Sequence, residues 1–127
     1  MPEAQCVRYP IKPGQREALV NWVARLKDRS TEVTEAMAEL GFIAEAVFME
    51  RSDHGDYLLI YTSAKDLRAA NEALSRSQLQ LVREFDHLMA ETVDMEKSAA
   101  LELLYHTPQE QLVRARRRRQ RRGLALL

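Results

Sequence analysis

Two strand-like segments, residues 42–51 and 57–62, constrain the fold more than any other feature of this sequence, because apolar side chains occupy both faces of each. The residues between them, Ser52-Asp53-His54-Gly55-Asp56, are typical of a hairpin turn. A hairpin centred in this turn pairs Phe48 with Tyr61. A sheet built on such a hairpin needs an apolar cover on each side.

The alternation of side chains along the hairpin assigns each residue to one of the two faces. One face carries only apolar side chains: Phe42, Ala44, Ala46, Phe48, Leu59 and Tyr61. The other face carries Ile43, Val47, Met49, Leu58, Ile60 and a single acid, Glu45.

The rest of the chain predicts one further strand and one helical region on each side of the hairpin. We expect a strand over residues 5–11 and an amphipathic helix over 15–40 that bends between Asp28 and Thr34. Helices over 64–75, capped by Ser63, and from Ser77 to about residue 92 are followed by a fourth strand over 100–106. This order predicts an α+β protein, a ferredoxin-like βαββαβ sandwich with a four-stranded antiparallel sheet.

Right-handed crossovers place both helical regions on the same face of the sheet. The other face would then expose a contiguous apolar patch, which soluble monomers rarely tolerate. A second copy packed sheet against sheet would cover it. We therefore predict a homodimer, the arrangement called a dimeric α+β barrel.

The net charge of zero conceals a division of the chain into two parts. Residues 108–127 contain seven arginines and one acid, whereas residues 1–107 contain 12 basic and 18 acidic side chains. We expect a folded domain over 1–107 and a basic helix or tail over 108–127. The basic residues of this tail are Arg114, Arg116, Arg117, Arg118, Arg119, Arg121 and Arg122.

Two roles of the arginine tail follow from its charge. It could bind nucleic acid or an anionic surface, or it could dock on the acidic body of its own dimer. No aromatic residue is interleaved with the arginines to stack on bases. We favour the second role because residues 1–107 already carry the complementary negative charge.

Several short motifs together resemble a known family. They are Lys12-Pro13-Gly14, Gly41-Phe42, Glu45-Ala46-Val47-Phe48-Met49-Glu50, Gly55-Asp56-Tyr57-Leu58, Asp66-Leu67, Ser77 and Leu103-Leu104-Tyr105. Over residues 5–106 the chain is similar to a bacterial family of small uncharacterised proteins of the dimeric α+β barrel superfamily. The resemblance implies this fold, and the wider superfamily includes monooxygenases and isomerase-like enzymes.

Glu45 is the candidate catalytic residue, because it interrupts an aliphatic strand face. A carboxyl group buried in an apolar pocket has a raised pKa and can act as a general base. Alternatively, Glu45 is solvated, or it forms an ion pair with Arg8. Together with Arg8, three tyrosines complete the candidate ligand-binding set: Tyr57, Tyr61 and Tyr105. Ordinary packing of aromatic residues in a sheet explains these tyrosines as well.

We expect no metal and no cofactor. Glu84 and His87 have the spacing of a carboxylate-bridged metal motif, but the apolar stripe of their helix turns them toward solvent. A single cysteine, Cys6, and the lack of a signal segment predict a cytoplasmic protein, and no apolar run is long enough to span a membrane.

The sequence therefore predicts a homodimeric protein that binds a small, partly apolar molecule between sheet and helices. Two alternatives stay open. One is a non-catalytic dimerisation or interaction module whose basic tail is the working part. The other is a cofactor-free monooxygenase or isomerase, by analogy with the superfamily.

Overall fold

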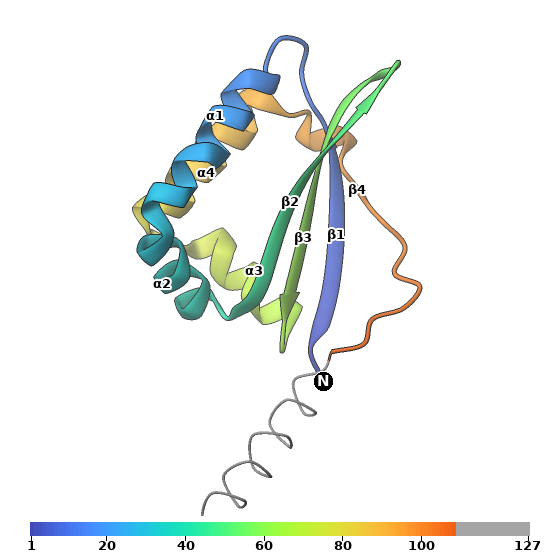
Figure 1. The fold of residues 1–127 in the computed structure, drawn as a ribbon. Helices are drawn as coiled ribbons and strands as arrows, with labels where there is room; N and C mark the ends of the chain where they lie inside the picture. The colour runs from blue at the N-terminus through green and yellow to red at the C-terminus, as the bar shows by residue number, and fades with distance from the viewer. Residues whose placement is uncertain (109–127) are drawn as a thin grey trace, which may run out of the picture.

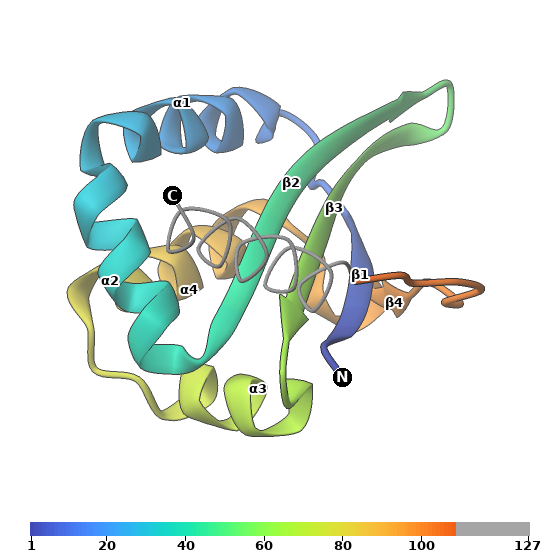
Figure 2. The same cartoon turned by 60° about the horizontal axis from the view of Figure 1, so that its bottom comes forward.

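A four-stranded antiparallel sheet, in the order β2-β3-β1-β4, forms one layer of the protein, and the helices cover one of its faces (Figures 1 and 2). The computed structural model describes residues 1–108. The elements in chain order are β1 (Glu3–Pro10), α1 (Arg16–Leu26), the 3-10 turn η1 (Lys27–Arg29), α2 (Ser30–Leu40), β2 (Phe42–Ser52), β3 (Gly55–Ala64), α3 (Leu67–Arg76), α4 (Gln80–Thr92), the 3-10 turn η2 (Met95–Lys97) and β4 (Ala99–Ala100). The predicted ferredoxin-like α+β fold is confirmed.

The β2–β3 hairpin is shifted by two residues from the predicted register. Phe48 pairs with Leu59 and not with Tyr61. The turn is shorter than expected because Ser52 already pairs with Gly55, whose φ of +126° suits a tight turn. Side chains alternate with a period of two, so from Ala44 onward the shift leaves the residues on their predicted faces. The prediction is wrong at the start of β2, where an irregularity between Phe42 and Ala44 turns Phe42 to the helix side and leaves Ile43 53% exposed.

The helical region after β1 is broken, as expected. The 3-10 turn η1 separates α1 from α2, and it overlaps the start of the stretch where we predicted a bend. Arg29 ends η1 and donates hydrogen bonds to Glu32 in α2 and Glu84 in α4. These contacts hold the bend against α4, and Figure 2 shows α1 and α2 running in different directions.

The cap predicted for the next helix is wrong. Strand β3 continues through Ala64, and the Ser63 hydroxyl donates to the carbonyl of Glu3 in the neighbouring strand. Asp66 caps α3 in its place, because its carboxylate accepts from the backbone N–H of Ala69.

The fourth strand is much shorter than the predicted 100–106. Ala99 and Ala100 pair with Arg8 and Val7 of β1, and the Leu101 N–H donates once more, to the Cys6 carbonyl. Beyond this point the chain leaves the sheet (Figures 1 and 2), so it forms no further ladder up to residue 108. Its exposed large hydrophobic side chains are Leu101, Leu103, Leu104 and Tyr105. The basic helix or tail was predicted over 108–127, and all of it after residue 108 lies outside the described residues.

The core lies between the sheet and the helices α1 and α4. It is a cluster of five buried residues: Leu19, Leu58, Ile60, Met89 and Val93. Leu58 and Ile60 alternate along β3, Met89 lies in α4, and Val93 directly follows this helix. No helix within residues 1–108 is both long and apolar enough to cross a membrane.

Candidate functional site

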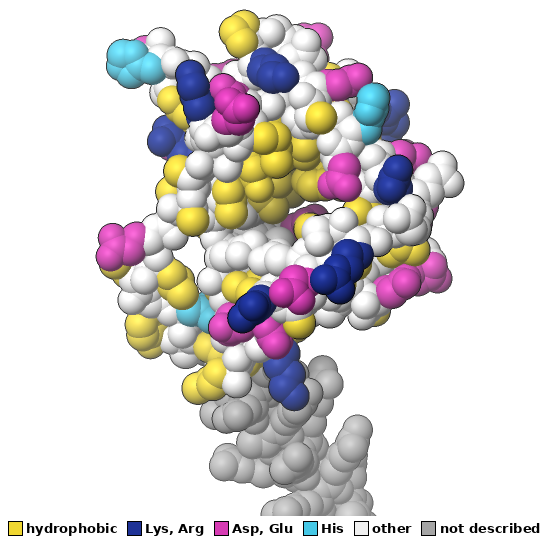
Figure 3. Space-filling view, turned by 180° about the vertical axis from the view of Figure 1, so that it is seen from behind, with side chains coloured by type: hydrophobic (Ala, Val, Ile, Leu, Met, Phe, Trp, Pro, Cys, Tyr) yellow, Lys and Arg dark blue, Asp and Glu magenta, His cyan; other side chains and the backbone are white. Residues whose placement is uncertain are grey.

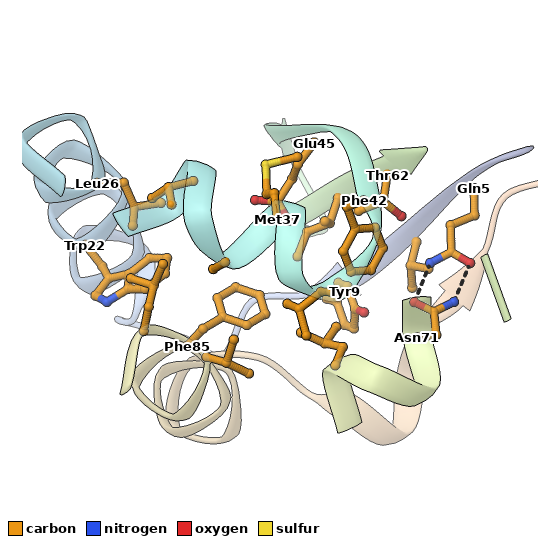
Figure 4. A pocket seen from close by; sticks show the side chains of 18 residues that line it. Gln5, Tyr9, Trp22, Leu26, Met37, Phe42, Glu45, Thr62, Asn71 and Phe85 are labelled. Atoms are coloured by element: carbon orange, nitrogen blue, oxygen red, sulfur yellow. Dashed lines mark hydrogen bonds between the residues drawn. The ribbon is translucent and has the colours of Figure 1, made fainter. Parts of the chain in front are cut away.

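A pocket of about 160 Å³ lies beside this core, between the helix-facing side of the sheet and the helices α1 to α4 (Figure 4). Its walls are mainly apolar and include four aromatic side chains: Tyr9, Trp22, Phe42 and Phe85. The Trp22 and Phe85 rings lie 5.5 Å apart. Figure 3 shows hydrophobic side chains gathered in a hollow on one face of the molecule.

A row of three polar side chains crosses the floor of this pocket. Thr62 in β3 pairs with Gln5 in β1 on one side and with Glu45 in β2 on the other. All three line the pocket. The next row along the sheet is apolar, because Ile60 pairs with Val7 and Val47. The polar row therefore interrupts a sheet face that otherwise builds the core.

The side chains of this polar row differ in their hydrogen-bond partners. The Gln5 amide pairs with the Asn71 amide of α3, donating to it over 3.5 Å and accepting from it over 3.2 Å (Figure 4). Thr62 is only 6% exposed, and within residues 1–108 its Oγ1 has no hydrogen-bond partner. Buried hydroxyl groups are normally paired, so this atom is a candidate for contact with a ligand.

Glu45 reaches the same pocket from β2. Glu45 is an exposed residue, as the solvated alternative predicts, yet the protein atoms around its carboxyl group raise its pKa by desolvation. An open pocket explains both observations. Water reaches Glu45 through the opening, while the pocket walls limit the hydration of its carboxyl group. Burial also raises the pKa of Tyr9, across the pocket floor on β1.

The raised pKa of Glu45 predicts how stability depends on pH. The folded protein holds the proton more tightly than the unfolded chain, so stability falls as pH rises through the pKa of folded Glu45. Glu45→Gln removes this loss. We expect the variant to be more stable than the wild type above that pKa by less than about 1 kcal/mol, since water screens an accessible carboxylate.

Urea unfolding of both proteins between pH 4 and pH 8 measures this difference. Glu39→Gln, at an exposed acid on α2, is the matched control. A loss of stability in Glu45→Gln at neutral pH would mean that the carboxylate is held by a structural partner.

The other predicted ligand-binding residues do not meet Glu45. Arg8 and Tyr57 lie on the sheet face away from the helices, where the Arg8 guanidinium carbon is 3.6 Å from the Tyr57 ring centroid. Arg8 Nη2 also pairs with Glu50 Oε1 at 2.7 Å, so the alternative ion pair with Glu45 is wrong. Tyr61 lies on the same outer face, opposite Cys6 and Ala46. Tyr105 is 83% exposed in the segment after β4.

The suspected metal motif on α4 is a solvated surface. His87 Nε2 lies 3.0 Å from Glu91, whereas Glu84 pairs with Arg29. Arg29 holds the pKa of Glu84 below its usual value. Residues 1–108 contain no group of three His, Cys, Asp or Glu side chains that could hold a metal ion.

Sequence reasoning missed Gln5, Thr62 and Asn71. The signal was a polar residue at the end of each alternating apolar series, Gln5 before Val7 and Tyr9, and Thr62 after Leu58 and Ile60. Such a residue also fits the solvated end of a strand, so the pattern alone does not indicate a site.

The sheet with helices on one face defines a ferredoxin-like α+β fold, a class that comparison with solved structures also shows. The chain belongs to the family of unknown function DUF6176, whose model matches residues 2–112. No curated protein matches the sequence.

Three of the similar solved structures illustrate the class. The protein Rv0793 of Mycobacterium tuberculosis has a TM-score of 0.53 and 19% identity, and the match covers 85% of this chain and 100% of that one. L-rhamnose mutarotase of Formosa agariphila has a TM-score of 0.55 and 14% identity, with 84% and 99% covered. The tetracenomycin F2 cyclase of Streptomyces glaucescens, a type-II polyketide cyclase, has a TM-score of 0.52 and 17% identity, with 84% and 99% covered. These likenesses show the fold.

Proposed function

We propose that this protein binds a small, largely apolar molecule in the pocket between sheet and helices. The observation that carries the proposal is the pocket itself, about 160 Å³ in volume, with aromatic and aliphatic walls and a polar row on one side. An apolar cavity of about 150 Å³ accommodates a molecule the size of benzene. The pocket therefore suits a ligand with a single ring.

Proton transfer to or from the bound molecule is the catalytic form of this proposal. Of the two catalytic alternatives, monooxygenation and isomerisation, the presence of Glu45 favours isomerisation. A carboxyl group of raised pKa beside an apolar ligand exchanges protons closer to neutral pH than an ordinary Glu does. The mutarotase and the cyclase named above support the proposal by analogy, since the same fold hosts enzymes of small molecules.

Filling the pocket tests the proposal. Ala36 on α2 is 7% exposed and lines the pocket, so Ala36→Leu would place three more carbon atoms in the space for the ligand. We expect it to weaken binding of a one-ring probe, toluene, by about 10-fold or more, because overpacking the site competes with the ligand. Trp22 reports binding by its fluorescence, since it is the only tryptophan in the chain and lines the pocket.

Ala38→Leu is the matched control, because Ala38 lies on the exposed side of the same helix. It should bind toluene as the wild type does. Equal binding by both variants would place the toluene elsewhere, and a wild type that binds no one-ring probe would contradict the proposed function.

We also propose that the protein acts as a cytoplasmic homodimer. Phe48 is 58% exposed on the outer face of the sheet, where its neighbours are Leu59 and Ala46. The apolar segment after β4 adds to the surface that a second copy would cover. A specific interface of ordinary size buries more than about 1,000 Å², for which the outer face of a sheet offers room.

The proposal also assigns a role to each of the two parts of the chain. Residues 1–107 carry the pocket and the core, and we propose that residues 108–127 are a separate basic tail. Docking on the acidic body of the dimer is the role that the opposite charges of the two parts support.

A further inference from the structure

We infer that Thr62 selects the ligand of this pocket, and that the ligand is a one-ring molecule that carries a hydroxyl or carbonyl oxygen and no negative charge. The inference rests on the proposed function, since it names the class of molecule that the same pocket takes. It depends on three observations about the polar row Gln5, Thr62 and Glu45.

The first observation is the orphaned hydroxyl of Thr62. Thr62 is 94% shielded from solvent, and its Oγ1 has no hydrogen-bond partner within the described part of the chain. Its two cross-strand neighbours on the pocket floor do not supply one. The Gln5 amide is occupied by Asn71, and no hydrogen bond joins Thr62 to Glu45 among residues 1–108. A ligand oxygen at this point would satisfy the hydroxyl, which can donate or accept.

The second observation is the absence of positive charge. Among the described residues, no Lys or Arg lines the pocket, and Arg8 is on the opposite face of the sheet. A carboxylate or phosphate would have to enter an apolar space beside Glu45 with no cation to neutralise it. Burial of an unpaired charge is strongly unfavourable, so anionic ligands are selected against.

The third observation is the arrangement of the walls. The row Gln5, Thr62 and Glu45 lies on the sheet, while Trp22, Phe85 and most of the aliphatic residues come from the helices opposite (Figure 4). A ligand with a ring at one end and an oxygen at the other matches this division. A pocket built to hydrogen-bond an oxygen discriminates against an analogue that lacks it, because the buried protein group is then left unpaired.

Four probes of equal ring size test the inference by Trp22 fluorescence: toluene, p-cresol, p-toluate and 4-methylbenzylamine. We expect p-cresol to bind about 10-fold or more tightly than toluene, and both charged probes to bind more weakly than p-cresol. Thr62→Val keeps the shape of the side chain and removes its hydroxyl. It should reduce p-cresol affinity to about that of toluene, leave toluene binding unchanged, and maintain or raise the melting temperature.

Ser63→Ala is the matched control. Ser63 is also buried, but its hydroxyl donates to the Glu3 carbonyl at 2.8 Å. This variant should lower the melting temperature and leave the ratio of p-cresol to toluene affinity unchanged.

The outcomes separate this inference from the proposed function. Equal affinity for toluene and p-cresol, tightest binding of a charged probe, or a Thr62→Val variant that keeps the preference for p-cresol would overturn the inference while the pocket still binds small molecules. A fall in the melting temperature of Thr62→Val would also overturn it, because the hydroxyl would then have a protein partner. Failure of all four probes to bind would contradict the proposed function itself.

Discussion

Phe48→Glu is expected to convert the protein from a dimer into a folded monomer. Phe48 is 58% exposed on the outer sheet face of the single chain, so the charge costs the isolated subunit little. In the proposed sheet-to-sheet dimer the same position would be buried, and an unpaired carboxylate there is strongly unfavourable. The loss of a central aromatic contact alone weakens an interface by about 2 kcal/mol, which is roughly 30-fold in dissociation constant.

Sedimentation equilibrium of the wild type and the variant measures this change, and circular dichroism verifies that the variant is folded. Ala69→Glu adds the same charge at an exposed position of α3, away from the sheet, and should remain dimeric. A wild type that sediments as a monomer at micromolar concentration would refute the proposed dimer. A dimeric Phe48→Glu variant would place the interface on another surface.

Leu19→Ala is expected to cost about 3 kcal/mol or more of unfolding free energy. Leu19 is 2% exposed on α1 and belongs to the buried cluster that joins the helices to β3. Truncating a fully buried leucine removes its transfer free energy and leaves a cavity, which together cost about 2.7–5 kcal/mol. Urea unfolding at one fixed protein concentration measures the loss, since the stability of the proposed dimer would depend on concentration.

The neighbouring residue on the same helix provides the comparison. Val20 is 45% exposed, so Val20→Ala should cost less than about 1 kcal/mol. If the two variants lose similar amounts of stability, the α1 face assigned to the core is incorrect.

The layers of the fold could be predicted from the sequence because they depend on local periodicity. Leu58 and Ile60 alternate with Leu59 and Tyr61, and this period of two assigns each side chain to a face without knowledge of its partner. The predicted Phe48–Tyr61 pairing was wrong by two residues, yet the faces from Ala44 onward were right, because a shift of two preserves them. The faces of Phe42 and Ile43 were wrong, because the strand is irregular between Phe42 and Ala44. Where a boundary depends on a distant partner, the prediction was less accurate. Residues 101–106 look like a strand, but the ladder with β1 ends after Leu101.

The candidate site shows the same division. Glu45 was predicted as an acid on an aliphatic strand face, and alternation along its own strand was enough to place it on the face of Val47 and Met49. The structure decided that this face meets the helices. Thr62 was not predicted, because its role depends on contacts between distant segments. It lies opposite Gln5 and Glu45 in the sheet, and Asn71 of α3 forms the hydrogen bond with Gln5. The sequence alone thus determined the element order, the two apolar sheet faces and the position of Glu45, since each follows from spacing along one segment. Only the tertiary structure decided which polar groups share the pocket floor and which of them is left unpaired, because hydrogen bonds between distant segments depend on register and packing.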